Sequence, residues 1–493
     1  MPTIKQEIAK GVFWIAVARY SGIFISLAIT AVLARNVSPA AFGTMAVATV
    51  IMAFLDIFTE FGIGPAVIQF KDLTRRDLSS LFMIGGSVGI VLGVALFLCA
   101  PVVARFYDDM TLVPVVRLLC ICLLFNSLNV VPNGLMLKAK RFRTVALRTL
   151  SFQLLCGCVA VWGALHGWGI YALIVTPIVT SVGVFIVNYV NYPLSLSLAI
   201  DFSPLRKVWG FSAYQFMFSF VNYFSRNLDK LIVGKYFSMS ELGYYDKSYR
   251  LMQLPLGYIT FVIGPVLHPI LSSLQDDKAE LARKNLKLVT LLSYISFPLG
   301  ILLFFTSGEI IRIIFGPNWA PAVPVFSILA LSLPLQIILS TSGAIYQAAG
   351  KTKHMFFCGL QSTVTTVSAF FIAALLFRTI ESMAWAWDIS LLINFIACYI
   401  VMNRITFRAS LRRYFLSYLP QIVNTLIVAI LSLLIFSHIT IHSDILSLLF
   451  KTAIVGLFTI IMAHLLHQYN AIVEIKRIIN RMAKQISLRF SKS

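Results

Sequence analysis

The sequence predicts an all-α polytopic membrane protein of 14 transmembrane helices. The first indication is composition: hydrophobic residues make up 59% of the 493-residue chain and charged residues 12%, against about 45–50% and 25% in soluble domains. The second is a mean hydropathy of +0.87, which leaves too few polar side chains to cover a protein in water. The third is a series of apolar runs of about 20 residues, the length that crosses a bilayer as a helix.

Each predicted span is an apolar run between charged or turn-forming residues. In chain order the runs cover 11–33, 42–63, 80–103, 112–131, 145–165, 169–190, 208–234, 244–271, 288–306, 323–349, 355–377, 382–402, 415–436 and 446–467. With a cytoplasmic N-terminus, 27 of the 40 Lys and Arg fall in cytoplasmic segments, 8 on the opposite side and 5 within spans. This asymmetry follows the positive-inside rule, so we expect both termini to be cytoplasmic.

The chain matches itself at an offset of 200 residues. The matching pairs are SPAAFG at Ser38–Gly43 with SMSELG at Ser238–Gly243, Gly64-Pro65 with Gly264-Pro265, and, at a slightly larger offset, Phe106…Pro114 with Phe315…Pro324. Each copy holds six spans. Because six is even, both copies enter the membrane from the same side, and a pseudo-two-fold axis along the membrane normal relates them, as in many transporters.

This repeat predicts the domain organisation. We expect an N-terminal six-helix lobe at 1–200 and a C-terminal six-helix lobe at 201–405. Two additional transmembrane helices and a basic cytoplasmic tail then occupy 406–493. In such an architecture the substrate binds between the lobes, and transport proceeds by rocking one lobe against the other.

Charged side chains inside the predicted spans form two clusters. The first contains Arg19, Asp56 and Glu60; the second contains Arg226, Asp229 and Lys230 and, across a turn, Asp246, Lys247 and Arg250. A charge at the bilayer centre costs about 2.5–3.5 kcal/mol on insertion scales, so each needs a partner or a wet cavity. Two interpretations stay open for both clusters: structural ion pairs between helices, or a site for a proton, a cation or an anionic substrate.

Three other basic residues lie near span ends. Arg117, Arg148 and Lys451 are each within a few turns of the membrane surface. Long basic side chains in such positions usually extend their charged ends to the interface. We therefore expect these three to snorkel.

Composition and motifs exclude several classes of function. The net charge of +21 would suggest nucleic acid in a soluble protein, but here the basic residues lie between apolar runs and face anionic lipid. No connection is long enough for a catalytic domain, no Asp-x-Asp motif of metal-dependent glycosyltransferases occurs, and the histidines lack a zinc-binding pattern. The sequence thus predicts no enzyme, no catalytic residue, no metal, no cofactor and no nucleic-acid partner.

Two segments carry a resemblance to a known family. RNLDKLIVGKYFSMSELGYYDKSYRLMQLP at Arg226–Pro255 resembles the helix 7–8 signature of the polysaccharide transporter family. The opening run, GVFWIAVARYSGIFISLAITAVLARNVSPAAFGTMAVA, is similar to the first two helices of that family. The family belongs to the multidrug, oligosaccharidyl-lipid and polysaccharide exporter superfamily, and the nearest likeness is to its lipopolysaccharide O-antigen and colanic-acid exporters.

The resemblance implies a flippase of the bacterial inner membrane. Its substrate would be an undecaprenyl-pyrophosphate-linked oligosaccharide repeat unit for lipopolysaccharide, capsule or exopolysaccharide, with membrane lipids, a polysaccharide polymerase and glycosyltransferases as partners. The expected pyrophosphate and sugar contacts are Arg19 and Arg250, followed by Arg226, Lys230 and Lys247. Asp56, Glu60 and Asp229 are the candidate ion-coupling residues.

Other functions compete with this one. A multidrug or cation antiporter has the same fold, but its cavity should favour carboxylates, whereas bases exceed acids by one in the two clusters. A peptidoglycan lipid II flippase should carry several Arg on the first two spans, where Arg19 alone is clearly internal. A membrane polysaccharide polymerase or glycosyltransferase is the remote alternative.

Overall fold

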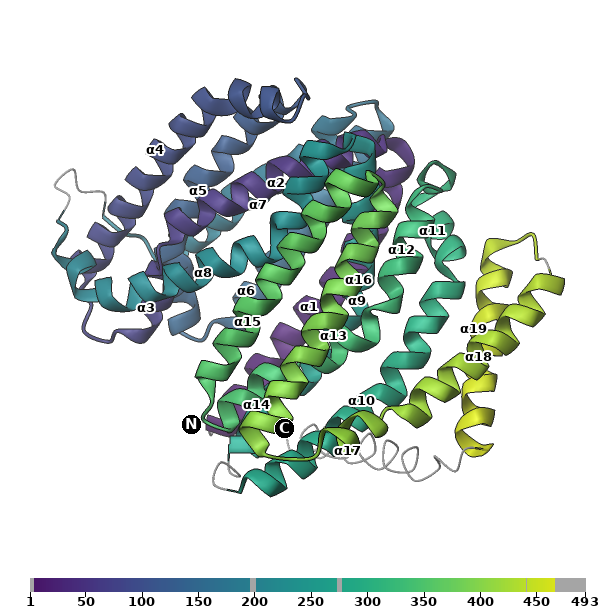
Figure 1. The fold of residues 1–493 in the computed structure, drawn as a ribbon. Coiled ribbons are helices and arrows are strands. Elements are labelled where there is room, and N and C mark those ends of the chain that lie inside the picture. Colours follow the sequence, from purple (N-terminus) through teal and green to yellow (C-terminus); the bar gives the residue numbers. More distant parts are fainter. Residues whose placement is uncertain (1–3, 196–200, 273–276, 440, 466–493) are drawn as a thin grey trace. The chain divides into compact units, whose positions relative to one another are not determined.

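The computed structural model describes residues 4–195, 201–272, 277–439 and 441–465 (Figure 1). Every regular element in these ranges is a helix, so the predicted all-α fold is confirmed. The α-helices are α1 (Ile4–Asn36), α2 (Pro39–Glu60), α3 (Ile63–Gln69), α4 (Arg75–Phe106), α5 (Leu112–Lys138), α6 (Phe142–Leu165), α7 (Ile170–Asn191), α8 (Ser203–Tyr236), α9 (Met239–Ser272), α10 (Lys278–Phe305), α11 (Ser307–Phe315), α12 (Ala322–Leu331), α13 (Leu333–Leu339), α14 (Ser342–Ala348), α15 (Thr352–Ile372), α16 (Ile380–Ile400), α17 (Leu411–Leu416), α18 (Leu419–His438) and α19 (Asp444–Leu465). Three short helical segments complete the order: η1 (Pro317–Trp319), η2 (Ala373–Phe377) and η3 (Val401–Phe407).

Within the described residues, helices lie over all fourteen ranges predicted as spans. Among the described residues, eleven helices are long and apolar enough to cross a membrane, and twelve if the bent pair α12 and α13–α14 counts as one span. The protein is therefore a multi-pass membrane protein. The two long helices outside this set, α8 and α9, are described only in part and carry the second predicted charge cluster. The basic tail lies outside the described residues.

Side chains at the helix starts explain where several helices begin. The Ser38 side chain accepts a hydrogen bond from the third residue after it, which starts α2. Thr74 and Asp77 form a reciprocal capping box at the start of α4. Ser238 and Glu241 do the same at α9, with bonds of 3.2 and 2.8 Å. Such caps satisfy backbone N–H groups that a helix start leaves without partners.

Neither Gly-Pro pair of the repeat forms a turn that ends a helix. Helix α2 ends at Glu60, before the first Gly-Pro pair, because Phe61 and Gly62 both adopt left-handed backbone conformations with φ of 35° and 67°. Pro65 lies in the first turn of α3, where no intrahelical N–H is needed. Pro265, its repeat equivalent, lies inside the continuous α9. The two copies thus differ in backbone at this point.

The described helices pack into two compact units. The first comprises residues 1–246 and 314–318, and the second 247–313 and 319–493. In the first unit α5 packs against α2, α4 and α7, α1 packs on α6, and α8 runs beside α2. In the second, α16 packs against α12, α13 and α15, while α18 and α19 form a hairpin beside α10 (Figure 1).

Aromatic side chains join α2 to α8 within the first unit. Phe54 and Phe58 of α2 and Phe61, which directly follows this helix, contact five rings of α8 with centroids 5.1–6.4 Å apart: Trp209, Phe216, Phe220, Tyr223 and Phe224. The Tyr223 hydroxyl also donates to the Val50 carbonyl at 2.9 Å. Aromatic pairs at these spacings add about 0.5–1.5 kcal/mol each beyond their buried area.

The two copies of the repeat cross at glycines in the first unit. A Cβ on Gly43 would lie 1.7 Å from the Met239 carbonyl oxygen, and one on Gly243 would lie 2.2 Å from the Pro39 carbonyl oxygen. Residues 43 and 243, and 39 and 239, are equivalent in the repeat. A contact in which i meets j and j meets i is the mark of a two-fold axis, so α2 and the start of α9 are two-fold related here.

A second reciprocal contact lies near this crossing in the repeat. Lys235 donates to the Phe106 carbonyl oxygen at 2.6 Å and pairs with Asp108 at 3.2 Å. Arg35, the equivalent of Lys235, lies against Gly316, which follows the equivalent of Phe106. Each basic residue thus lies against the corresponding connection of the other copy, Lys235 through its ammonium group and Arg35 through the stem of its side chain.

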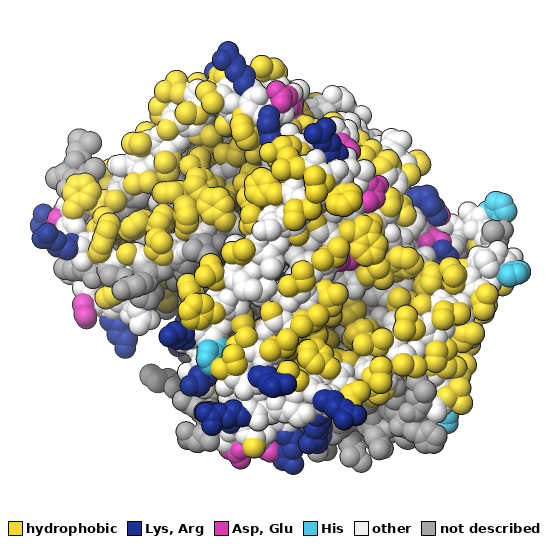
Figure 2. Space-filling model, in the orientation of Figure 1, with side chains coloured by type: hydrophobic (Ala, Val, Ile, Leu, Met, Phe, Trp, Pro, Cys, Tyr) yellow, Lys and Arg dark blue, Asp and Glu magenta, His cyan; other side chains and the backbone are white. Residues whose placement is uncertain are grey.

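The basic connections of the second unit gather at one end. Asn285 of α10 donates to the Met402 sulfur at 3.4 Å, and His354 at the start of α15 bonds the Thr406 hydroxyl at 2.9 Å. These bonds bring together three segments rich in Lys and Arg, at 278–287, 351–353 and 404–413. Figure 2 shows Lys and Arg near α14 and α17 and hydrophobic side chains over the helices beyond them. Predicted cytoplasmic loops therefore share one end of this unit.

The glycine crossing generates a stability prediction. Gly43→Ala places a methyl group where no space exists, so we expect it to destabilise the protein by about 1–3 kcal/mol. The apparent Tm of the purified protein in detergent should fall by a few degrees. Gly359→Ala is the matched control, because a Cβ on that helical glycine meets nothing within 4 Å. Equal Tm values for the two variants would contradict the crossing.

Candidate functional site

The eight predicted site residues lie on four helices. Arg19 is on α1, Asp56 and Glu60 are on α2, Arg226, Asp229 and Lys230 are on α8, and Lys247 and Arg250 are on α9. The side chain of Arg226 lies outside the described residues. The first six belong to the first unit and the last two to the second.

The two carboxylates of α2 share one helix face. Asp56 is partly buried, and the Asn126 amide of α5 lies 3.4 Å from each of its oxygens. Glu60, one turn further on, is exposed. Like charges four residues apart on a helix repel, and the amide offsets this only by a neutral hydrogen bond. The pair can therefore attract a proton or a cation.

Lys230 lies in a buried ion pair. Its Nζ is 3.0 Å from Asp246 Oδ1, and the two side chains are 11% and 2% exposed. Asp229, which precedes Lys230 in the chain, is 3% exposed. This geometry favours the structural interpretation of Lys230, because a buried pair already neutralises much of its charge. Its role as a substrate contact stays a prediction.

Arg19 and Arg250 present exposed side chains, each within its own unit. Lys247, one turn before Arg250 on α9, is partly buried. A guanidinium group offers a planar set of donors that matches phosphate oxygens in a bidentate arrangement. These two arginines therefore have both the chemistry and the accessibility that a pyrophosphate contact needs.

Arg148 does not snorkel, contrary to the prediction. Its guanidinium donates to the Asn188 side chain of α7 and, at 3.4 Å, to the side-chain amide oxygen of Asn133 on α5. Asn188 also donates to Asn129 at 2.7 Å. These amide oxygens replace water as acceptors, so the arginine points into the first unit and links α5, α6 and α7.

Lys451 does not snorkel either. Its Nζ lies 2.6 Å from Glu309 of α11 and donates to the Phe305 carbonyl oxygen at 3.0 Å. Burial disfavours the charged Glu309 carboxyl, but hydrogen bonds from Lys451 and Ser447 outweigh it and lower the pKa of Glu309 below its usual value. Arg312 and Asp444 form a second pair at 2.8 Å. Together they attach α19 to the end of α10 and to α11.

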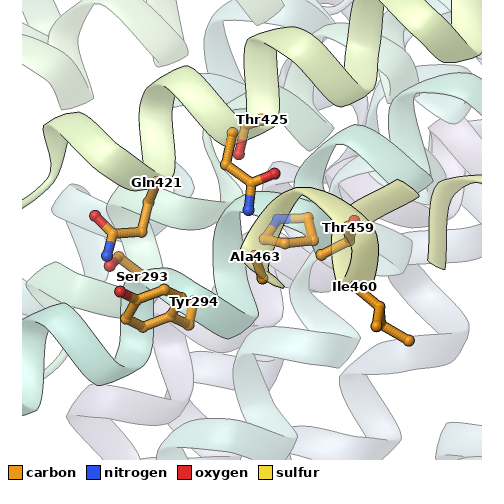
Figure 3. A pocket seen from close by; sticks show the side chains of 9 residues that line it. Ser293, Tyr294, Gln421, Thr425, Thr459, Ile460 and Ala463 are labelled. Atoms are coloured by element: carbon orange, nitrogen blue, oxygen red, sulfur yellow. The ribbon is translucent and has the colours of Figure 1, made fainter. Parts of the chain in front are cut away.

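One cavity of about 180 Å³ lies in the second unit, among α10, α18 and α19 (Figure 3). Its lining residues are Ser293, Tyr294, Pro298, Gln421, Asn424, Thr425, Thr459, Ile460 and Ala463. With its amide turned to accept from Tyr294 at 3.0 Å, Gln421 also donates to two backbone carbonyls. None of the eight predicted site residues lines this cavity, and we do not assign it to the substrate.

Asp388 of α16 is a buried acid that the sequence did not single out. It is 9% exposed, and neither carboxylate oxygen has a hydrogen-bond partner among the described residues. A single acid inside an apolar run was the only signal available. Within the described ranges no group of three or more His, Cys, Asp or Glu is placed to hold a metal ion.

Comparison with known proteins identifies the family. The family described as "Polysaccharide biosynthesis protein" matches residues 32–324, more than half of the chain. The chain belongs to this family. The matched range includes the crossing glycines and all the predicted site residues except Arg19.

Two curated relatives match over most of their length. The teichuronic acid biosynthesis protein TuaB of Bacillus subtilis is 24% identical over 401 residues, 80% of this chain and 82% of TuaB. The lipopolysaccharide biosynthesis protein WzxC of Escherichia coli is 26% identical over 437 residues, 84% of this chain and 85% of WzxC. Both similarities extend well beyond the matched family range.

Solved structures share the fold. The lipid II flippase MurJ in an inward closed conformation gives a TM-score of 0.73 at 15% identity, covering 93% of this chain and 99% of MurJ. A multidrug resistance MATE family transporter in an inward-facing conformation gives 0.61 at 12% identity, covering 79% and 96%. At such low identities the likeness establishes the fold alone.

The buried Lys230–Asp246 pair generates a second prediction. Lys230→Met leaves Asp246 buried without its cation, so we expect a loss of about 3–5 kcal/mol. Lys230→Met with Asp246→Leu should recover much of this loss. Thermal unfolding of both variants in detergent measures the effect.

Lys235→Met is the matched control, since its partner Asp108 is 80% exposed and exposed pairs contribute about 1 kcal/mol or less. A loss in Lys230→Met no larger than in this control would show that the pair carries little stability.

Proposed function

We propose that the protein is a flippase that moves an undecaprenyl-pyrophosphate-linked oligosaccharide repeat across the bacterial inner membrane by alternating access. The observation that carries this proposal is the similarity to polysaccharide biosynthesis proteins over about four fifths of the chain, in a fold that it shares with a lipid II flippase. A succinoglycan biosynthesis transport protein, ExoT of Rhizobium meliloti, is a further relative at 21% identity. The product serves lipopolysaccharide, capsule or exopolysaccharide synthesis.

The membrane arrangement that fits this function has 14 spans and cytoplasmic termini. Helices α8 and α9 are each 34 residues long, enough to cross the bilayer, and their polar faces suit a position next to a wet cavity. The gathering of basic connections at one end of the second unit supports a cytoplasmic location for that end. A polysaccharide polymerase and glycosyltransferases would act before and after the flippase, and the chain itself needs no catalytic residue.

The substrate head would bind between two six-helix lobes, at 1–200 and 201–405. Reciprocal contacts at Gly43 and Gly243 support a two-fold relation between the repeats from which the lobes are built. Arg19 and Arg250 are the proposed pyrophosphate contacts. Arg226, Lys230 and Lys247 follow, Lys230 only if the ion pair with Asp246 opens. The polyprenyl tail would stay in lipid.

Movement against a gradient requires a coupled ion. Asp56 and Glu60 lie on one face of α2, and Asp229 is buried beside Lys230. Carboxyl groups in these positions change charge when they bind a proton or a cation, and so change the electrostatic energy of neighbouring cationic groups. We propose these three as the ion-coupling residues of the first unit.

Replacing the proposed phosphate contacts tests the function. Arg19→Ala and Arg250→Ala should each abolish surface polysaccharide in a strain that depends on this gene, while the protein stays in the membrane at normal level. Vesicles that contain the purified protein should lose flipping of a labelled lipid-linked sugar in parallel. Arg117→Ala is the control, because its guanidinium lies over the Phe97 ring at 4.7 Å. Normal polymer in both test variants would remove the two arginines from the substrate path.

Neutralising the α2 carboxylates tests the coupling. We expect Asp56→Asn with Glu60→Gln to make flipping in vesicles much less sensitive to an imposed proton or sodium gradient, because the carboxyl pair of α2 can no longer titrate. The basal exchange without a gradient should persist. If the double variant responds to both gradients as the unmodified protein does, the carboxylates are structural.

A further inference from the structure

Asp388 lies deep in the second unit, eight residues from the start of α16, or about 12 Å at 1.5 Å per residue. Its side chain is 9% exposed and its carboxylate oxygens have no hydrogen-bond partner in the described part of the chain. An ionised carboxylate buried without donors costs several kcal/mol, whereas a protonated carboxyl needs only one acceptor for its O–H. These surroundings favour the neutral acid.

Few charged or titratable groups lie on the described stretches that adjoin α16. Helices α12 and α13 and segment η2 contain no titratable side chain. The other adjoining stretches carry charged or titratable groups mainly near their ends. Those described are Lys353, His354 and Cys358 in the first turns of α15, Arg404 in η3, Glu381, Cys398 and Tyr399 near the ends of α16, and Tyr249 and Arg250 on α9. His354 bonds Thr406 beyond the far end of α16, which places the start of α15 there. Tyr249 contacts Trp387 through its ring, at 5.3 Å.

Helices α12 and α13 both pack against α16, and the Ser332 hydroxyl between them is a polar group that acts on the Asp388 carboxyl without being hydrogen-bonded to it in this structure. Ser332 separates α12 from α13, where the span bends by 45°. Pro334, which has no N–H, interrupts the backbone hydrogen bonds and accounts for the bend. The Ser332 hydroxyl donates to the Leu329 carbonyl oxygen at 2.7 Å and accepts from Gln336 Nε2 at 3.0 Å. One lone pair of its oxygen remains for a further donor.

The same bend is linked to α9. Gln253 Nε2 of α9 lies 3.4 Å from Gln336 Oε1, and Gln336 Nε2 lies 3.1 Å from the Met252 sulfur. A chain of polar groups therefore runs from Ser332 through Gln336 to the helix that carries Arg250. A change at Ser332 has a direct route to the predicted substrate helix.

We propose that Asp388 is a proton-binding carboxyl that sets the bend between α12 and α13 through Ser332. With the proton bound, the carboxyl O–H donates to Ser332 Oγ, and the hydroxyl keeps its bond to Leu329. When the proton leaves to water, the carboxylate needs a donor, and the Ser332 hydroxyl turns from the Leu329 carbonyl to it. One proton is exchanged with water, and the hydrogen bond donated by the Ser332 hydroxyl moves from the Leu329 carbonyl oxygen to the Asp388 carboxylate. Only the use of this proton in transport rests on the proposed function.

Carbodiimide labelling tests proton binding on the unmodified protein. A hydrophobic carbodiimide reacts with protonated carboxyls inside a membrane, and peptide mass spectrometry locates the adduct. We expect Asp388 to be labelled at pH 6 and labelling to fall several-fold as the pH is raised to 9. Glu309 is the matched control, since it is 4% exposed but held by Lys451, and it should stay unlabelled.

Distance measurement tests the link to the bend. Spin labels at Val323 and Gln347, on a background without the native cysteines, report the distance across the bend by pulsed electron resonance. The distance should shift between pH 6 and pH 9 in the otherwise unmodified chain. Asp388→Asn should hold the low-pH distance at both pH values. Ser332→Ala should abolish the shift while Asp388 is still labelled.

Two results would overturn the inference: an Asp388 that is unlabelled at every pH or labelled independently of pH, or a distance shift that persists in Asp388→Asn. Neither measurement needs a substrate. A wild-type protein that fails to flip lipid-linked sugar but shows pH-dependent labelling and the distance shift would refute the proposed function and leave this inference standing.

Discussion

The cost of an unpaired charge in hydrocarbon governs how the interior of this protein is built. Lys230 meets Asp246, Lys451 meets Glu309, and Arg148 is held by amide oxygens. Each of these contacts joins different helices, so the penalty for separating the partners also fixes how the helices pack. Polar contacts therefore carry packing specificity that lipid-facing apolar surface cannot supply, because lipid tails are as apolar as the side chains.

The repeat imposes a second constraint, and it acts through backbone contact. Where α2 and the start of α9 cross, the two chains approach so closely that only glycine fits at positions 43 and 243. Each copy carries the same glycine, since each serves as the neighbour of the other. The SPAAFG and SMSELG motifs are thus explained as one half each of a symmetric contact. The Phe61–Gly62 break occurs in one copy only, so the symmetry is local and the copies have diverged.

The helices could be predicted because long apolar runs leave the backbone no alternative in lipid. The positions of Arg148 and Lys451 could not, because their partners are 40 and 142 residues away in sequence and nothing local identifies them. The Gly-Pro pairs of the repeat do not locate helix ends either. Proline is tolerated in the first turn of α3 and inside α9, so the motif does not by itself locate a helix end. Residue type predicted the candidate site, but which charges are neutralised depended on tertiary contacts.

The distinction between paired and unpaired buried acids bears on how a gradient can drive transport. A carboxylate held by a cation, such as Glu309, keeps its charge across the physiological pH range and cannot report a proton gradient. A buried carboxyl without a hydrogen-bond partner changes its charge for a modest change in its surroundings, and within the described residues Asp388 is such a group. Because Asp388 faces the break in a span, its charge is coupled to a backbone that already bends. The fold thus keeps structural charges paired and leaves a titratable one where the helix can respond to it.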